Sequence, residues 1–358
     1  MTKNRYYIAS QKELLSFISE VKNVDLLAID TEFVRRDTYY PILSIIQIAF
    51  GDSFYIIDCL SGIDISDFLE ILTNDKLVKI IHSSSQDLQI LNHISNSSNT
   101  ITHGVEDTQI MANFAGLGFN IGYSNLVAKT LNHLIDKKQQ LSDWKRRPLN
   151  QKQIDYAFLD VKYLEEIHSI LHQAIKERGR LDWFKEEMAN YLDGILKVRD
   201  EDLFGKFALS NKTLRYKDKL KELILWREDM ARKINVPRQH LIKNEALEKI
   251  VINQDCDFLN LDQKLKQEIS DILKSDYQQN NVVKTFHSTQ PLTEKQKNTY
   301  LRIKTKISTI SKQEDISEQF LITSGSLKRI VLGHDDLNNA ISGWRYELLG
   351  KEISNLLA

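Results

Sequence analysis

Four short apolar segments in the N-terminal part of the chain constrain its fold most strongly. Each is rich in Ile, Leu and Phe and is bounded by polar or charged residues, a pattern that predicts buried β-strands. The segments are LLAIDTEF (26–33), LSIIQIAF (43–50), SFYIID (53–58) and KLVKIIH (76–82). Strands first, followed by strand and helix in alternation, predict an α/β domain with a mixed sheet.

Helix signals surround these strands. Ser10 followed by Glu13 is a capping-box pattern that predicts a helix start, and Ser66 is the expected N-cap of a second helix. The segment SQDLQILNHI (85–94) is expected to open a further helix. Asn150 and Gly179 are typical of a start and an end, so one long helix is predicted between them.

The strand pattern does not continue beyond about residue 205. Residues 212–283 and 292–358 each have the pattern of short amphipathic helices, and the polar segment SDYQQNNVVKTFHSTQP separates the two sets. We therefore predict three domains. These are an α/β domain over residues 1–205 and two small all-α domains over 206–284 and 285–358.

The composition is that of a folded, soluble protein. The chain has 358 residues, 42% of them hydrophobic, which excludes a disordered chain or a disulfide-stapled miniprotein. Apolar runs end well before the ~18 residues that a membrane span needs, and the first residues lack a secretory signal. We expect a cytoplasmic protein without membrane association, in which Cys59 and Cys256 are unpaired thiols.

The near-neutral net charge of −1 hides a difference between the two parts of the chain. Residues 1–205 contain 22 basic and 29 acidic side chains, whereas residues 206–358 contain 26 basic and 20 acidic ones. An acidic part can concentrate cations and a basic part can bind a polyanion. The basic excess is modest, so taken alone it favours an ordinary solvated surface over nucleic-acid binding.

Three carboxylates are candidates for metal binding. Asp30 and Glu32 lie two apart on a predicted strand, so both side chains leave the same face. Two adjacent anions are costly unless a cation neutralises them, and oxygen ligands favour Mg²⁺ or Mn²⁺. Asp87 follows the next strand, at the edge of an α/β sheet where ligands bind. Each has an alternative reading, because D-x-E pairs occur by chance and Asp87 also suits a first helical turn.

A phenol and a carboxylate are expected on one helix face. Tyr156 and Asp160 are four residues apart, which places them about one turn apart on the same side of the predicted helix. The ordinary alternative is a tyrosine that packs against the core and an aspartate in solvent.

Together these residues resemble the DEDD superfamily of 3′→5′ exonucleases, in which D-x-E, a later Asp and a helix with Tyr-x3-Asp follow in this order. Asp155 occupies the position where the histidine branch has His, so the chain is similar to the tyrosine branch. Five longer segments resemble the ribonuclease D family in order and context. They are IDTEFVRRDTYYPILSIIQIA, IIHSSSQDLQIL, EDTQIMANFAG, LSDWKRRPLNQKQIDYAFLDVKYL and GWRYELLG.

The resemblance extends over nearly the whole chain. It implies a ribonuclease H-like mixed sheet for the first domain. Residues 223–250 resemble the helical nucleic-acid-binding domain that ribonuclease D shares with RecQ-type helicases, with the box Trp226, Arg227, Ala231, Asn235 and Pro237. The final segment resembles a second, diverged copy that lacks this box. No G-x4-G-K-[ST] motif is present, so helicase activity is not supported.

The resemblance also implies roles for the site residues. Asp30 is expected to bridge two divalent ions, Mg²⁺ or Mn²⁺, with Glu32 and Asp160 at the first ion. Asp87 is expected to serve the second ion through water. Tyr156 is expected to orient the attacking water, because a phenol with a pKa near 10 is a poor base at neutral pH.

Trp144 and Arg147, just before the catalytic helix, are candidate contacts for the 3′-terminal nucleotides. Tryptophan offers a stacking face and arginine a phosphate fork. The structural alternatives are nearly as good, since Trp144 can anchor its loop to the core and Arg147 can belong to a solvated basic run.

The expected function is a metal-dependent exoribonuclease that trims the single-stranded 3′ ends of tRNA precursors and other structured RNA. Nucleoside 5′-monophosphates would be the products, and no protein partner is indicated. Two alternatives remain open at this stage. One is a DNA 3′→5′ exonuclease, and the other is an RNA-binding scaffold without catalysis.

Overall fold

The computed structural model describes residues 4–95, 100–135, 142–197, 203–204, 207, 213, 215–275 and 291–357. The chain divides into two compact units, the first comprising residues 1–34, 43–196 and 291–358 and the second 35–42 and 197–290. The predicted domain boundaries at 205/206 and 284/285 lie outside the described residues. They therefore stay predictions.

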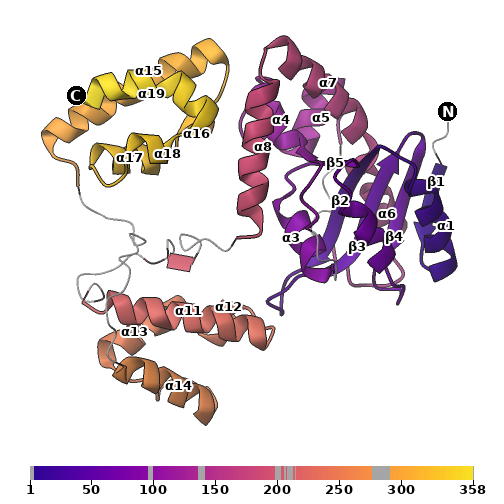
Figure 1. The fold of residues 1–358 in the computed structure, drawn as a ribbon. Coiled ribbons are helices and arrows are strands. Elements are labelled where there is room, and N and C mark those ends of the chain that lie inside the picture. The colour runs from indigo at the N-terminus through magenta and orange to yellow at the C-terminus, as the bar shows by residue number, and fades with distance from the viewer. Residues whose placement is uncertain are drawn as a thin grey trace. The chain divides into compact units, whose positions relative to one another are not determined.

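A six-stranded mixed sheet forms the centre of the first unit (Figure 1). The strands are β1 (Asn4–Ile8), β2 (Leu26–Val34), β3 (Ile42–Phe50), β4 (Ser53–Asp58), β5 (Val78–Ile81) and β6 (Val105–Asp107), in the order β1-β4-β3-β2-β5-β6. The pairs β1/β4, β2/β5 and β5/β6 are parallel, and β3/β4 is antiparallel. The predicted α/β fold with a mixed sheet is confirmed, including its four predicted strands. The edge strands β1 and β6 were not predicted.

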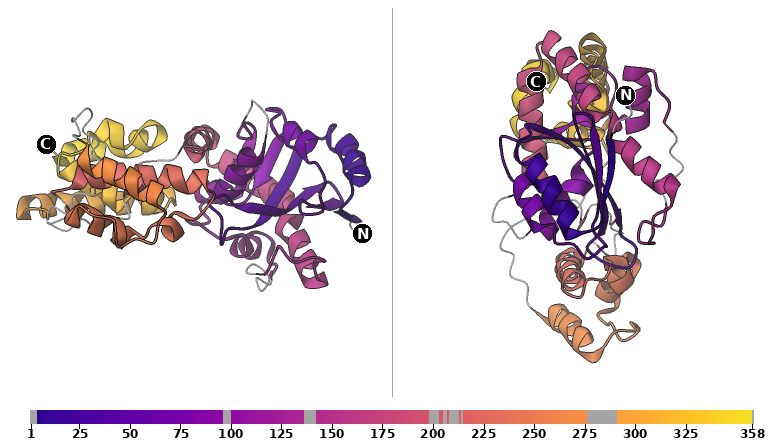
Figure 2. Two further views of the ribbon diagram at one scale, coloured as in Figure 1. Left: turned by 90° about the horizontal axis from the view of Figure 1, so that it is seen from below. Right: turned by 90° about the vertical axis from the view of Figure 1, so that its right-hand side faces the viewer.

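Helices pack on both faces of the sheet (Figure 2). They are α1 (Gln11–Val21), α2 (Ser66–Leu72), α3 (Ser85–Ile94), α4 (Thr108–Phe114), α5 (Tyr123–Leu131), α6 (Gln151–Lys162), α7 (Leu164–Glu177) and α8 (Leu181–Ile195). One apolar cluster joins α1 to Leu27 and Ile29 of β2. A second cluster joins α6 to Ala28. Alternate residues of β2 therefore belong to opposite layers, as the period of a strand requires.

The helix starts largely follow the capping signals. Both hydrogen bonds of the capping box are present at Ser10 with Glu13, and also at Asn150 with Gln153. Ser66 is a correction, because it is the first residue of α2 and Ile65 is the N-cap. The Asp64 carboxylate accepts a hydrogen bond from the Ser66 amide at 2.9 Å, so another side chain satisfies this helix start.

The predicted long helix from Asn150 to Gly179 is two helices, α6 and α7, which meet at Tyr163. The Tyr123 hydroxyl accepts a hydrogen bond from the Tyr163 amide at 3.2 Å and donates one to the Leu159 carbonyl at 3.1 Å. These two backbone groups would bond each other in a continuous helix. The inserted hydroxyl therefore separates them and ends α6. Gly179, with φ of +68°, follows the end of α7.

The C-terminal helices belong to the same unit as the sheet. They are α15 (Glu294–Glu314), α16 (Glu318–Leu321), α17 (Ser324–Val331), α18 (Leu337–Ala340) and α19 (Gly343–Leu357). Trp344 is fully buried, and its ring centroid lies 5.1 Å from that of Phe114. Arg180 bonds the Glu314 carboxylate at 3.0 Å. Apolar packing and ion pairs thus join these helices to the α/β part.

The second unit contains a separate apolar core. Its longer helices are α11 (Lys217–Lys233), α13 (Asn244–Asn253) and α14 (Gln263–Lys274), and the short helix α12 (Arg238–Leu241) connects the first two. Within the sequence box noted above, the Trp226 indole donates to Glu268 at 2.8 Å. Arg227 is 2% exposed and donates to the Ile242 carbonyl at 2.7 Å. These two box residues hold the helices of this unit together.

Residues 35–42, which directly follow β2, group with these helices. The Tyr39 hydroxyl donates to Glu228 and accepts from Arg232 at 3.0 Å. The Tyr40 amide donates to the Asn235 side chain at 3.1 Å. The segment that leaves the strand of Asp30 and Glu32 is therefore bonded to α11 and the turn after it.

Within the described ranges, no helix combines the length and the apolar character that a bilayer crossing requires. Cys59 and Cys256 are both unpaired, which confirms the prediction of two free thiols.

Replacing Tyr123 by Phe tests the junction of α6 and α7. The change leaves the Tyr163 amide and the Leu159 carbonyl without their shared partner, so the free energy of unfolding should fall by about 1–3 kcal/mol. Denaturant unfolding measures this change. Tyr6→Phe, at a side chain that is 46% exposed, is the matched control and should unfold like the parent. Equal stability of both variants would contradict the role of the hydroxyl.

Candidate active site

Asp30 and Glu32 lie toward the carboxyl end of β2, which is flanked by β3 and β5. Ala28 of the same strand belongs to the apolar cluster under α6. Since strand side chains alternate, Asp30 and Glu32 leave the sheet on the face that α6 covers. Both residues are half-buried.

Asp87 reaches the same region from α3, which begins four residues after the end of β5. Strands β2 and β5 are parallel neighbours, so their carboxyl ends lie at the same edge of the sheet. Asp87 is 6% exposed, and its Oδ1 atom accepts a hydrogen bond from the Thr31 hydroxyl. Thr31 stands between Asp30 and Glu32 in the sequence, so this hydrogen bond links β2 to Asp87 of α3.

Helix α6 supplies the remaining two side chains, Tyr156 and Asp160. The hydroxyl of Tyr156 interacts with the Asp160 carboxylate. The Oδ2 atom of Asp160 is itself inaccessible to solvent and has no hydrogen-bond partner. A buried carboxylate oxygen without a partner is a costly arrangement that a bound cation would relieve.

The electrostatics show that the four carboxylates are neighbours. Removal from water, followed by repulsion from Asp160 and Asp87, holds the pKa of Asp30 well above its usual value. Desolvation and the charges of Asp30 and Asp87 raise the pKa of Glu32 to about 9. Desolvation and Glu32 likewise raise the pKa of Asp160. The structure therefore brings together carboxylates that are spread over 130 positions of the sequence, from Asp30 to Asp160.

Two further shifts affect the protonation states at the site. Burial raises the pKa of Asp87 to about 6, although the hydrogen bond from Thr31 opposes the shift. Desolvation and the nearby charges of Asp160, Glu32 and Asp30 raise the pKa of Tyr156. Its phenol is therefore protonated at neutral pH and acts as a hydrogen-bond donor.

The donor set fits a hard divalent cation. All four acidic side chains offer oxygen, which Mg²⁺ and Mn²⁺ prefer, and burial together with nearby negative charge raises the pKa of three of them, Asp30, Glu32 and Asp160. Among the residues that the structure describes, no three acidic, His or Cys side chains already form a coordination set for one ion. The carboxylates are thus close neighbours rather than a finished cage.

Trp144 lies in the core and not on an open surface. It is 2% exposed, packs in the cluster under α6 and lies 6.1 Å from Tyr156 between ring centroids. Its backbone carbonyl accepts hydrogen bonds from Ser44 and Arg147. This placement favours the structural alternative, in which Trp144 anchors its loop and supports the ring of Tyr156.

Arg147 is fully engaged within the protein. Its Nε and Nη2 atoms both bond the Asp58 carboxylate at 2.7 Å. Its Nη1 atom bonds the Trp144 carbonyl at 2.8 Å, and Nη2 also bonds Ser44. A guanidinium with this many partners has little capacity left for a phosphate, so the structural alternative is favoured here too.

The sequence motifs did not identify Thr31 and Tyr123 as part of this region. Thr31 bonds Asp87, and Tyr123 ends the helix that contains Asp160. Negative charge on Asp160 and Asp30 adds to burial in raising the pKa of Tyr123, which places its hydroxyl near the carboxylates. The position of Thr31 between two acidic residues was the one available signal, and Tyr123 belongs to no motif.

Comparison with known proteins agrees with this arrangement. The 3′-5′ exonuclease domain family matches residues 6–176. The crystal structure of RNase D from Escherichia coli, an exoribonuclease involved in structured RNA processing, superposes with a TM-score of 0.79. The two chains are 25% identical, and the match covers 99% of this chain and 98% of the other. The fold and the domain match define a 3′→5′ exonuclease.

Proteins named ribonuclease D extend the similarity to nearly the full length. The one from Nitrobacter hamburgensis is 30% identical over 96% of this chain and 93% of its own length. The one from Bartonella henselae is 29% identical over 98% of this chain and 89% of its own length. The chain belongs to the ribonuclease D family of 3′→5′ exoribonucleases. Exonucleases with this fold generally depend on divalent metal ions.

The raised pKa of Glu32 predicts a pH dependence of stability in EDTA. When the pKa of an acid is higher in the folded than in the unfolded protein, its protonated form stabilises the fold. This contribution is complete at pH values below the unfolded pKa. That contribution is lost as pH rises from about 4.5 through about 9. The free energy of unfolding should therefore fall across this range, by an amount on the order of a few kcal/mol.

Glu32→Gln should flatten this fall, whereas Glu70→Gln, at an exposed carboxylate on α2, should leave it unchanged. Adding Mg²⁺ at high pH should restore stability, because a ligand that binds only the folded state stabilises it. An identical pH profile for the parent and Glu32→Gln would contradict the shift.

Arg147→Ala separates a structural role from a substrate-binding role. Loss of the guanidinium leaves the Asp58 carboxylate, only 5% exposed, without its cation, so stability should fall by roughly 3 kcal/mol. Arg146→Ala, at the exposed neighbouring arginine, is the control. Chemical denaturation and RNA affinity are measured for both variants. Weakened RNA binding at unchanged stability would show that Arg147 contacts the substrate.

Proposed function

We propose that this exoribonuclease trims the single-stranded 3′ ends of tRNA precursors and other structured RNA by two-metal-ion hydrolysis. It would release one nucleoside 5′-monophosphate per cycle. The observation that supports this proposal most strongly is the convergence of Asp30, Glu32 and Asp160, where burial and then repulsion between the carboxylates raise their pKa values and one buried oxygen of Asp160 has no partner. Such crowding of anions is expected where a cation binds.

In this proposal Asp30, Glu32 and Asp160 would hold the two Mg²⁺ or Mn²⁺ ions. Asp87 would contribute to the metal site through water. Bound ions of this kind lower the pKa of a water nucleophile and stabilise charge on the departing 3′ oxygen. The Asp160 oxygen that has no protein partner is then a ligand atom.

Tyr156 is proposed to orient the attacking water. Its phenol keeps its proton at neutral pH, because burial and then the surrounding carboxylates raise its pKa above its usual value. It can therefore donate a hydrogen bond but cannot serve as the base. The ring of Trp144 lies beside that of Tyr156, with centroids 6.1 Å apart.

The basic C-terminal part supports RNA as the substrate. Residues 206–358 contain six more basic than acidic side chains, which favours contact with a polyanion. The similar E. coli protein is described as an exoribonuclease involved in structured RNA processing. We propose action in the cytoplasm and no obligatory protein partner. Parallel digestion of matched RNA and DNA strands distinguishes this function from a DNA exonuclease.

Asp30→Asn tests the catalytic proposal. The neutral side chain should lower the rate of 3′ trimming of an extended tRNA precursor by at least roughly 1,000-fold, because it weakens binding of both ions. RNA affinity measured in EDTA should stay within about twofold, since binding rests on phosphate contacts elsewhere. Asp52→Asn, at an exposed carboxylate of the β3–β4 turn, should trim at the parental rate.

Full trimming activity of Asp30→Asn would overturn the assignment of this residue. A parent enzyme that leaves the precursor intact with both Mg²⁺ and Mn²⁺ would overturn the proposed substrate. A parent that binds RNA but hydrolyses none would support the scaffold alternative.

A further inference from the structure

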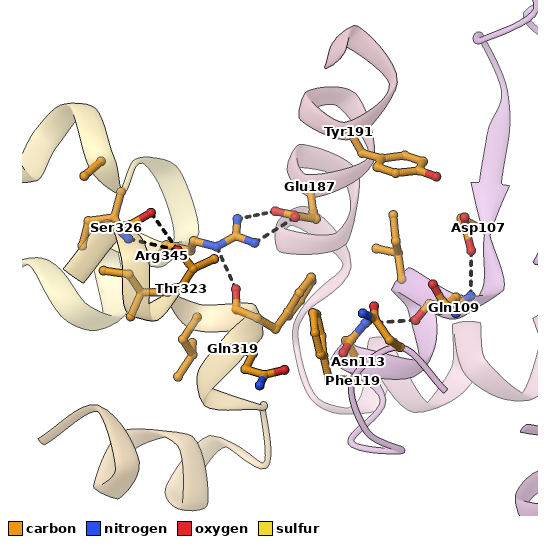
Figure 3. A pocket seen from close by; sticks show the side chains of 17 residues that line it. Asp107, Gln109, Asn113, Phe119, Glu187, Tyr191, Gln319, Thr323, Ser326 and Arg345 are labelled. Carbon is orange, nitrogen blue, oxygen red and sulfur yellow. Dashed lines mark hydrogen bonds and ion pairs between the residues drawn. The ribbon is translucent and has the colours of Figure 1, made fainter. Parts of the chain in front are cut away.

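A cavity of about 360 Å³ lies within the first unit, and none of the four carboxylates lines it (Figure 3). One wall comes from α4, the segment after it and α8, and the other comes from the C-terminal helices α16 to α19. The proposed catalytic residues do not line it. Its lining combines aromatic rings, amides and paired charges.

Aromatic side chains form part of its surface. Phe119 and Phe320 line the cavity from opposite walls, with ring centroids 6.1 Å apart. Tyr191 lines it from α8 (Figure 3). Such faces stabilise a planar aromatic ligand by stacking.

An amide supplies an unused hydrogen-bond acceptor. Asn113 is 4% exposed and lines the cavity. Its Nδ2 atom donates to the Gln109 carbonyl at 3.0 Å, but its buried Oδ1 atom has no partner. Because an unpaired buried acceptor is costly, a ligand N–H that bonds this oxygen would bind favourably.

The charged groups of the cavity already have partners within the protein. Arg345 is the one cation among the described residues that line it, and it pairs with both carboxylate oxygens of Glu187 (Figure 3). Its Nε atom donates to the Phe320 carbonyl at 3.0 Å. Asp107 accepts hydrogen bonds from backbone amides and the Ser84 hydroxyl. This pairing disfavours a phosphate or another strongly charged ligand.

We propose that this cavity binds a nucleobase. A base is planar and uncharged, and its ring or exocyclic N–H group suits the free oxygen of Asn113. The proposal rests on the proposed function in one respect, since RNA or a released mononucleotide supplies the base. Both sources share this chemistry.

The cavity wall is bonded to the start of the helix that contains Asp87. The Ser84 amide and hydroxyl donate to Asp107 at 2.7 and 2.9 Å. The same hydroxyl lies 3.3 Å from the Tyr191 hydroxyl. Asp107 and Tyr191 both line the cavity, so an occupant contacts residues that fix the first turn of α3.

Ligand-observed saturation-transfer NMR on the full-length protein tests the site directly. Adenosine and cytidine at millimolar concentration should receive saturation, whereas ribose 5-phosphate, which lacks a base, should not. Ala340→Trp fills the cavity from α18 and should abolish the transfer. Asn338→Trp adds the same bulk to the exposed side of α18 and should bind nucleosides like the parent.

RNA affinity in EDTA distinguishes the two sources of the base. If a base of bound RNA occupies the cavity, Ala340→Trp should raise the Kd for single-stranded RNA by roughly fivefold or more. If a free mononucleotide is the ligand, Ala340→Trp should lose nucleoside binding while its RNA Kd is unchanged. Neither assay needs cleavage, so failure here is separate from failure of the trimming reaction.

Phe119→Leu is a second variant that keeps the wall apolar, and it should weaken nucleoside binding by roughly fivefold through lost stacking. It keeps the proposal testable if Ala340→Trp does not fold. Two results would overturn the proposal. One is no nucleoside binding to the parent, and the other is equal nucleoside binding to the parent and a folded cavity variant.

Discussion

Repulsion among four carboxylates that are partly shielded from water is the constraint on which the structure depends. Burial, and next the charge of neighbouring carboxylates, raise the pKa values of Asp30, Glu32 and Asp160, so the cluster by itself opposes folding. The sheet offsets this cost with apolar packing on both faces, against α1 on one side and α6 on the other. A divalent cation relieves the same repulsion. The cost in stability and the proposed affinity for metal therefore have one physical origin.

Patterns within short segments could be predicted from the sequence. The capping box at Ser10, the extent of α3 and the common face of Asp30 and Glu32 follow from local hydrogen bonding and from the period of a strand. Contacts made across the chain could not be predicted. Tyr123 divides the predicted long helix because its hydroxyl enters the backbone ladder from another element, and no local pattern at Tyr163 records this.

The same limit applies to the two proposed substrate contacts and to the helical domains. The basic run that contains Arg147 is typical of a phosphate-binding segment. In the structure, however, Arg147 bonds Asp58, which lies 89 positions away in the sequence. The two helical sets have the same kind of turn after their first long helix. Asn235 after α11 and Asp315 after α15 both have a φ of +52°. Asn235 there accepts from the Tyr40 amide, whereas Asp315 pairs with Arg178 at 3.1 Å. Similar turns therefore bond different segments, which their local sequences do not specify.

The central claim is that these carboxylates share divalent cations, and anomalous diffraction from a crystal containing Mn²⁺ and a nucleoside 5′-monophosphate tests it most directly. The account predicts two anomalous peaks ~3.5–4 Å apart, with Asp30 touching both and Asp160 touching one. Peaks remote from Asp30, or carboxylates that point into separate regions of the protein in the presence of the metal, would contradict it.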